Sequence, residues 1–205
     1  PIGIHADAGK FSHQDALFVI TWNSLLGQGP TIEQRFVITA IRKTQLVETG
    51  ATLNAIFKVI SWSLNCMAEG MRPIVDEDDN PLPGSSERTS LAGPWRGLCC
   101  QVRGDWQFYC QAFNFPQWNV AGRMCWMCQA SSVSERLFWT NFNRDAGWRR
   151  TCWDHEAYMA FLAESDSDVP ELFSIKGLRL ECITIDVLHC VDLGVAQHVI
   201  GNTLW

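Results

Sequence analysis

Residues 97–105 read GLCCQVRGD, a short apolar run that stops at an aspartate. We predict a strand over residues 97–103 that ends at Gly104-Asp105. The beginning of the chain repeats this pattern: residues 2–7 read IGIHAD, and we predict a short apolar strand that ends at Asp7. These two strands, each followed by a carboxylate, determine how the rest of the chain is interpreted.

The segment between them is predicted to contain two further strands and one helix. Residues 16–22 and 35–41 are rich in β-branched and aromatic residues, and turn-forming stretches precede both. Residues 48–70 carry apolar side chains at helical spacing, and Gly70 is a natural terminator. The predicted order is therefore three strands, a helix and a fourth strand.

The remaining elements are shorter. Residues 72–96 are predicted to form a loop, in which the acidic run 76–79 is more simply a solvated segment than a metal site. A short helix is expected over residues 106–113, directly after the fourth strand. Residues 178–185 are predicted to be extended, and a helix is predicted from Asp186 onward.

Three strands, a helix and a fourth strand, with aspartates after strands one and four, is the pattern of a ribonuclease-H-like core. We therefore predict an α/β fold on a mixed sheet. Carboxylates on neighbouring strand ends can hold two divalent cations about 4 Å apart, which serve phosphodiester chemistry. Hard oxygen ligands suit Mg²⁺ or Mn²⁺. Asp7 and Asp105 are the candidate catalytic ligands, and the alternative is that each is a turn residue.

Two ligand pairs after the fourth strand predict a zinc site. Cys125-Trp126-Met127-Cys128 and Cys152-Trp153-Asp154-His155 each place two residues between potential ligands. This spacing lets both side chains of a tight turn face one ion, and tetrahedral zinc takes four nitrogen or sulfur donors. We predict one structural Zn²⁺ held by Cys125, Cys128, Cys152 and His155, with Cys152 the ligand most in need of a test. Scattered buried thiols and a redox Cys-x-x-Cys pair are the alternatives.

Composition narrows the class of protein. Of 205 residues, 47% are hydrophobic and ten are Trp, which predicts a folded chain with a substantial core. The net charge of −6 argues against a surface that binds nucleic acid everywhere, although it allows a local basic channel. Nine cysteines, an odd number, without a secretory signal predict a reducing intracellular compartment. No apolar run is long enough to cross a membrane.

Several blocks of sequence resemble eukaryotic DDE transposases, with the CACTA-type and related elements nearest in character. Residues 5–9 (HADAG) with 17–26 (LFVITWNSLL) resemble the first-aspartate region, and residues 103–106 (RGDW) resemble the second-aspartate block. In those proteins a Cys-x-x-Cys pair follows the second aspartate, as Cys125 and Cys128 do here. The most specific match is residues 185–195 (IDVLHCVDLGV), which resemble the family's Asp/Cys-x-x-His signature.

That signature assigns Asp186 and His189, three residues apart and hence on one face of a helix. They either orient the DNA or the catalytic centre, or Asp186 caps the helix while His189 packs behind it. The family's third acid is a glutamate beyond this block, and no Glu follows Glu181 here. We expect that glutamate to lie beyond residue 205 and the present chain to be inactive alone. The alternative is that Asp186 is itself the third acid.

The resemblance implies three regions: residues 1–115 as the first part of the core, residues 116–165 as a zinc-binding insertion, and residues 166–205 as the return to the core, whose C-terminal part is missing. Six Trp crowd the middle of the chain and are expected mainly to fill the core. Arg149 and Arg150 are the candidate DNA contacts.

The activity implied by the resemblance is metal-dependent cleavage and joining of transposon-end DNA in the nucleus, by a protein that could form a homo-oligomer and has no membrane partner. Two alternatives stay open. In one, the chain is a domesticated or decayed relative that binds DNA or protein through its zinc module without cutting. In the other, the zinc module is a protein-interaction domain and the strand-end aspartates are turn residues.

Overall fold

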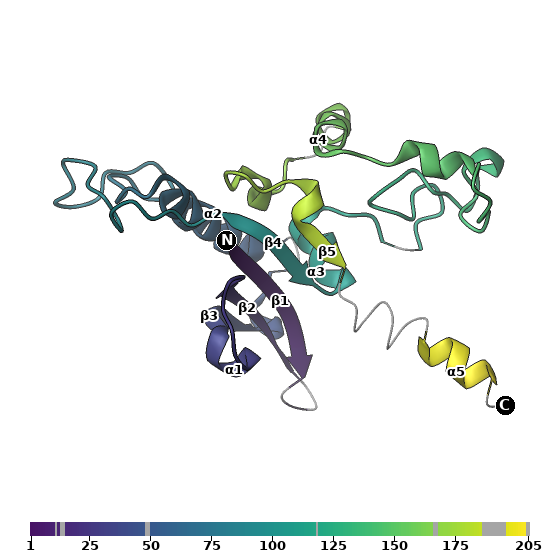
Figure 1. The fold of residues 1–205 in the computed structure, drawn as a ribbon, viewed down its shortest axis with the longest axis horizontal. Coiled ribbons are helices and arrows are strands. Elements are labelled where there is room, and N and C mark those ends of the chain that lie inside the picture. Colours follow the sequence, from purple (N-terminus) through teal and green to yellow (C-terminus); the bar gives the residue numbers. More distant parts are fainter. Residues whose placement is uncertain are drawn as a thin grey trace.

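A five-stranded mixed sheet organises the chain (Figure 1). The computed structural model describes residues 1–10, 12, 15–47, 50–117, 119–165, 168–185 and 196–203. The strands are β1 (Ile2–Lys10), β2 (Ala16–Ser24), β3 (Phe36–Arg42), β4 (Cys99–Gly104) and β5 (Ile183–Ile185), in the spatial order β3-β2-β1-β4-β5. Strands β1, β2 and β3 pair antiparallel, whereas β4 is parallel to β1 and β5 is parallel to β4. The predicted α/β class and mixed sheet are confirmed.

Five helices accompany the sheet in the described residues: α1 (Thr31–Gln34), α2 (Ala51–Glu69), α3 (Trp106–Phe113), α4 (His155–Glu164) and α5 (Gln197–Thr203). Short 3₁₀ turns lie at Lys43–Gln45, Glu135–Leu137, Gly147–Thr151, Glu171–Ser174 and Leu180–Cys182. Helix α3 has the bounds predicted from the sequence. Helix α2 ends as predicted at Gly70, whose left-handed conformation (φ 67°) closes the helix without a Cβ penalty.

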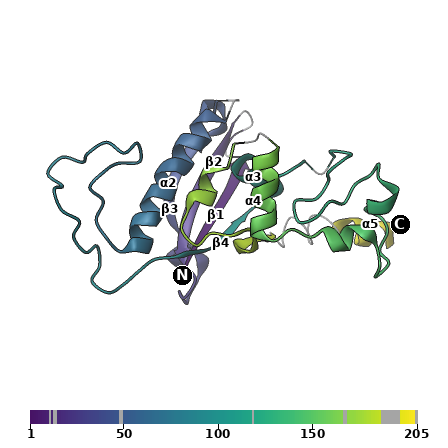
Figure 2. The same cartoon turned by 90° about the horizontal axis from the view of Figure 1, so that it is seen from above.

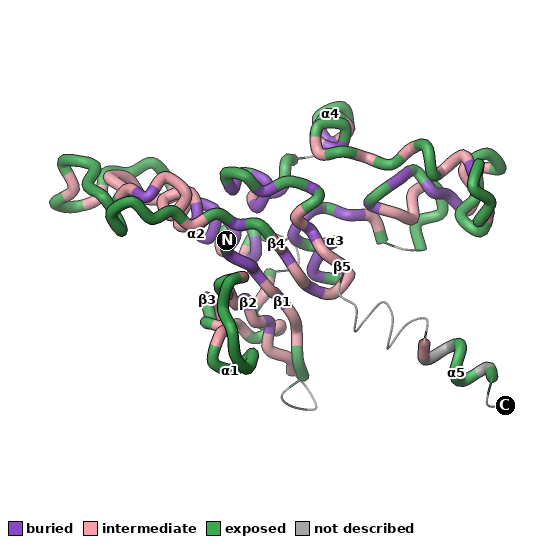
Figure 3. The backbone as a smooth tube through the Cα atoms, in the orientation of Figure 1, coloured by how far each residue is buried: buried purple, intermediate pink, exposed green. Residues whose placement is uncertain are grey.

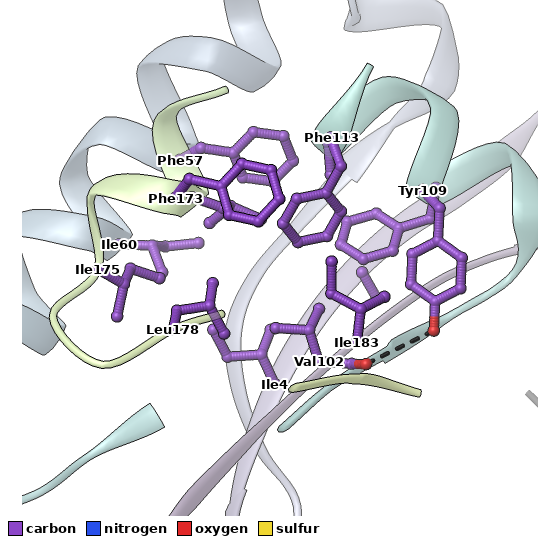
Figure 4. Packing of buried hydrophobic residues seen from close by; sticks show 14 of the residues in the cluster. Ile4, Phe57, Ile60, Val102, Tyr109, Phe113, Phe173, Ile175, Leu178 and Ile183 are labelled. Atoms are coloured by element: carbon purple, nitrogen blue, oxygen red, sulfur yellow. Dashed lines mark hydrogen bonds between the residues drawn. The ribbon is translucent and has the colours of Figure 1, made fainter. Parts of the chain in front are cut away.

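The core lies between one face of the sheet and the helices α2 and α3 (Figure 2). Alternate residues of β1, namely Ile2, Ile4 and Ala6, are buried on this face, as the period of a strand requires. They meet one side of α2, whose buried residues recur at helical spacing: Leu53, Phe57, Ile60 and Leu64. Figure 4 shows how Phe57 and Ile60 of α2, Phe113 of α3 and the later residues Phe173 and Ile175 close over Ile4 and Val102.

Strand β1 is longer than the sequence predicted, so Asp7 does not end it. The antiparallel pairing with β2 continues to Lys10, opposite Ala16. Backbone hydrogen bonds hold this extension, and they do not depend on the apolar side chains from which the strand was predicted. The parallel pairing with β4 does stop near the expected place, at Ala6 and Gly104.

Residues 116–165 are mostly irregular and are tied to the core by aromatic packing. The indole of Trp126 is 5% exposed and stacks on Phe115, with 4.8 Å between ring centroids. Tyr158 of α4, fully buried, packs edge-on against Phe115. Figure 3 shows where burial is concentrated: buried residues gather where β1, β4, α2 and α3 meet, whereas β3, α1 and residues 81–96 are mostly exposed.

The sequence analysis missed α4, because His155 was assigned to a metal-binding turn. Asp154 instead caps this helix, since its carboxylate accepts the N–H of Ala157 at 2.8 Å. None of the helices in the described ranges combines the length and apolar character needed to cross a bilayer.

Candidate functional site

The parallel pairing of β1 with β4 ends directly before the two predicted catalytic aspartates, so both follow the same end of this strand pair. Ala6 is the register partner of Gly104. Asp7 and Asp105 are therefore the next residues along two neighbouring segments of the chain. Adjacent strands lie about 4.8 Å apart, which sets the separation of the two backbones at Ala6 and Gly104, one residue before each aspartate.

Asp105 is held by the helix that it starts. It is the N-cap of α3, in extended conformation, and its Oδ1 accepts the N–H of Phe108 at 2.6 Å. This hydrogen bond satisfies one of the free N–H groups at the helix start, and the positive end of the helix dipole favours the carboxylate charge. The alternative role expected for Asp105 was that of a turn residue. In the structure Asp105 makes this capping bond, which uses Oδ1.

Asp7 is fixed by a local contact, since its Oδ1 accepts the N–H of Ala8 at 2.6 Å. Among the described residues, no hydrogen bond or ion pair reaches Oδ2 of Asp7 or Oδ2 of Asp105. Each carboxylate thus keeps one oxygen that a cation could use. Both side chains are half-buried, so their positions are restrained while water and ions can still approach.

A buried corner that the sequence analysis missed joins β4 to α3. The N–H of Gly104 donates to the hydroxyl oxygen of Tyr109 at 3.0 Å. That hydroxyl in turn donates to the carbonyl of Thr184 in β5 and lies 3.5 Å from the carbonyl of Val102 (Figure 4). Tyr109 therefore ties the end of β4 to β5. The only hint in the sequence is that Tyr109 lies one helical turn after Asp105.

Gly104 itself is required by close packing. A Cβ at this position would lie 2.8 Å from the carbonyl oxygen of Ala6 and would press against the Phe108 ring. Neither the backbone of β1 nor a ring that is 2% exposed can move away easily. The glycine before Asp105 thus allows β1, β4 and α3 to approach one another.

The signature pair Asp186 and His189 lies outside the described residues, so both interpretations of this pair remain predictions. What the structure describes is the strand that precedes it. Ile185, the last residue of β5, is the register partner of Gly104. The pairing of β5 with β4 therefore ends on the same step as the pairing of β1 with β4.

The two predicted zinc-binding turns lie side by side. The N–H of Trp153 donates to the carbonyl of Met127 at 2.9 Å, and the N–H of Gln129 donates to the hydroxyl of Thr151 at 3.0 Å. The Cys125 sulfur accepts the N–H of Met127 at 3.3 Å. These contacts connect the segment that carries Cys125 and Cys128 to the segment that carries Cys152.

The thiols of these segments interact. Burial raises the pKa of Cys128 to about 11, and a hydrogen bond with Cys125 and the nearby charge of Cys152 add to this effect. Cys125 is half-buried and Cys152 is exposed. All eight cysteines in the described part of the chain are free thiols. The charges of Cys125 and Cys152 thus influence the buried Cys128 thiol.

His155 is engaged elsewhere. Its Nδ1 accepts the N–H of Leu180 at 3.2 Å, and its ring lies 5.6 Å from the ring of Phe173. A neutral imidazole whose Nδ1 accepts a hydrogen bond carries its proton on Nε2. In this arrangement neither ring nitrogen offers a free lone pair to a metal. In keeping with this, no group of three or more His, Cys, Asp or Glu side chains in the described ranges is arranged to hold a metal ion.

The candidate DNA contacts Arg149 and Arg150 are both exposed. Arg149 stabilises its own loop, because its guanidinium donates to the carbonyls of Asn143 and Phe142 and lies 4.6 Å from the ring centre of Trp148. Several of the neighbouring Trp pack on the core, as predicted: Trp106, Trp126 and Trp153. Trp139, by contrast, is 45% exposed, and Trp118 lies outside the described residues.

Comparisons with known proteins add nothing to this geometry. No family model matches the chain, and no curated protein and no solved structure matches it either. The function of the protein must therefore be inferred from the residues and contacts described above.

Proposed function

We propose that the chain contains most of the ribonuclease-H-like catalytic core of a DDE-type transposase, which cleaves and joins DNA strands with the help of divalent cations. The observation that carries this proposal is the register of β1 and β4, in which Asp7 and Asp105 both follow the last paired residues, Ala6 and Gly104. The sheet supports it, because three antiparallel strands and a helix precede a strand that is parallel to the first.

In this proposal Oδ2 of Asp7 and Oδ2 of Asp105 are the cation ligands contributed by the sheet. A pair of Mg²⁺ ions bound there would activate a water or a DNA 3′-hydroxyl and stabilise the departing oxygen. The contribution of the protein itself is to hold the two carboxylates in position. The bond from Phe108 to Asp105 and the bond from Ala8 to Asp7 restrain the two carboxylates before any cation arrives.

We also propose that Cys125, Cys128 and Cys152 hold a structural Zn²⁺. The support is that the two turns are hydrogen-bonded to each other and that their thiols interact. His155 can complete the set only by giving up the N–H of Leu180. Zinc would then fasten residues 116–165 to the core at the Trp126 contact.

The experiment that tests the catalytic proposal is titration of the chain with Mn²⁺, followed by paramagnetic broadening of backbone amide NMR signals. Broadening is expected near residues 6–8 and 104–106, and it should be lost in both Asp7→Asn and Asp105→Asn. Asp15→Asn, which changes the same charge at the residue directly before β2, where the carboxylate accepts the N–H of Ala16 and the hydroxyl of Thr44, is the matched control and should keep it.

Broadening that both variants leave unchanged, or that is confined to the acidic loop at residues 76–80, would refute the cation site and with it the nuclease function. A decayed relative that binds DNA without cutting would show the same negative result. Metal-dependent nicking of duplex DNA by the full-length protein, abolished by each of the two variants, is the corresponding test of activity.

A further inference from the structure

Two arginines lie on the sheet face opposite the helices, and neither has a carboxylate partner among the residues that the structure describes. Arg103 of β4 is the register partner of His5 in β1. Arg35, which precedes β3, reaches across β2 so that its Nη1 lies 3.5 Å from Nδ1 of His5. We refer to Arg35 and Arg103 as the arginine pair.

The surroundings of the arginine pair do not neutralise it. Five ion pairs link described residues, and none includes Arg35 or Arg103. Arg103 donates from Nη2 to the amide oxygen of Asn23 at 2.7 Å, while its Nε is buried and has no partner. Burial lowers the pKa of Arg103, and the positive charge of Arg35 lowers it further.

Such an arrangement is costly unless an anion compensates it. Burying a cation without a counter-charge is unfavourable, and a second cation nearby increases the cost. Arg123, which also has buried nitrogens without partners, lies 4.2 Å from the ring centre of Phe161 and is stabilised by that ring. Neither Arg35 nor Arg103 has a ring contact of this kind among the described residues.

The position of the arginine pair relative to Asp7 and Asp105 indicates which anion would bind it. Arg103 of β4 lies two residues before Asp105, the N-cap of α3, and His5 lies two residues before Asp7 in β1. Two residues of a strand span about 6.6 Å. One strand of DNA carries a phosphate about every 3.4 Å along the helix axis. A strand whose scissile phosphate lies at the aspartates can therefore bring a nearby phosphate to the guanidinium groups.

We infer that Arg35 and Arg103 bind a backbone phosphate of a DNA strand beside the aspartates, through the forked hydrogen bonds that guanidinium forms with phosphate. This inference rests on the proposed function for its choice of ligand. Arginine suits the role because its planar donors match phosphate oxygens and its charge persists at neutral pH. In a chain with a net charge of −6, a local pair of cations of this kind favours contact with DNA.

The test is fluorescence anisotropy with a labelled DNA duplex in buffer without Mg²⁺ or Mn²⁺ and without a chelator, so that cations at Asp7 and Asp105 play no part while bound zinc is kept. Binding is measured over a salt series for the wild type, Arg35→Gln and Arg103→Gln. Each phosphate contact contributes about 0.9 to the slope of log K against log salt, so each variant should lower that slope by about 1. Arg88→Gln removes an equal charge from an arginine that is paired with Glu69, and it should leave the slope unchanged.

Stability separates phosphate binding from a structural role. Without DNA, Arg35→Gln should be at least as stable to urea as the wild type, because it removes a repulsive charge. An arginine that only braces the sheet would give the opposite result. Arg103→Lys keeps the charge but loses the fork, so it should bind DNA more weakly than the wild type and more tightly than Arg103→Gln.

Unchanged slopes in Arg35→Gln and Arg103→Gln, or a slope that falls only in Arg150→Gln, would overturn this inference. The double variant Asp7→Asn/Asp105→Asn makes its failure distinguishable from failure of the proposed function. If that variant leaves Mn²⁺ binding intact while the arginine variants weaken DNA binding, the nuclease proposal fails and the phosphate site stands. If it abolishes Mn²⁺ binding while the arginine variants have no effect, the reverse holds.

Discussion

The hydroxyl oxygen of Tyr109 accepts the backbone N–H of Gly104 at 3.0 Å, one residue before the strand-end aspartate Asp105. The same hydroxyl donates to the carbonyl of Thr184, so one side chain of α3 connects the ends of β4 and β5. The corner that carries Asp105 is thus fixed by a contact that no motif in the sequence indicates.

Removing this hydroxyl should destabilise the protein. Tyr109→Phe leaves the N–H of Gly104 buried without an acceptor, which costs about 1–3 kcal/mol. Urea unfolding measures the change. The chain has only one other tyrosine, Tyr158, whose hydroxyl makes a long 3.4 Å contact with the carbonyl of Phe113. Tyr158→Phe is therefore the matched control and should cost less; an equal loss in both variants would argue against a special role for Tyr109.

The two roles of Asp105 can be separated by choice of substitution. Asn caps helices about as well as Asp, whereas Ala cannot accept the N–H of Phe108. We expect Asp105→Ala to lose about 1 kcal/mol of unfolding free energy and Asp105→Asn to lose far less, as measured in urea. Both should lose the cation. Should Asp105→Asn prove as unstable as Asp105→Ala, the carboxylate charge would be holding the corner together.

Among the tryptophans, Trp126 should contribute most to the stability of residues 116–165. Truncating a buried, stacked Trp to Ala costs about 3–5 kcal/mol. The same change at Trp139, which is 45% exposed, should cost well under that. Thermal unfolding of the two variants makes the comparison. Similar losses would mean that residues 116–165 pack differently in solution.

Zinc analysis decides the ligand set. After dialysis, elemental analysis of the purified chain should give one zinc per chain for the wild type and for Cys182→Ser, a control outside the thiol group. Cys125→Ser, Cys128→Ser and Cys152→Ser should lose zinc. His155→Gln should keep most of it, because Nδ1 of His155 is used by Leu180. Full zinc in Cys152→Ser would remove Cys152 from the site, and loss of zinc in His155→Gln would restore His155 to it.

Buried thiols predict a loss of stability in alkali. Burial raises the pKa of Cys99 from 9.0 to about 12. The folded state therefore keeps the proton that the unfolded state loses, so this contribution is complete below pH 9 and disappears as the pH rises toward 12. Unfolding free energies measured on both sides of pH 9 should fall more steeply in the wild type than in Cys99→Ala. Parallel curves would show that the Cys99 thiol does not titrate differently on folding.

Local pattern was sufficient for most of the regular elements. Alternating and β-branched residues predicted the strands, helical spacing with Gly70 predicted α2, and the apolar run that stops at Asp105 predicted both β4 and the start of α3. These features are encoded over a few neighbouring residues, because side-chain period and capping act locally. Helix α4 was missed because Asp154, its cap, sits inside a motif that also matches a metal-binding turn.

The sequence by itself determined that Asp7 and Asp105 each follow a short apolar segment, and that four potential zinc ligands occur in two pairs. Only the tertiary structure decided that Ala6 and Gly104 pair, so that both aspartates follow the same end of the β1–β4 pair. It also decided that His155 turns to Leu180, and that Arg35 and Arg103 lie near His5 with no ion pair to a described carboxylate. Such relations join residues up to about a hundred positions apart, and they arise from strand register and side-chain packing, which no local pattern specifies.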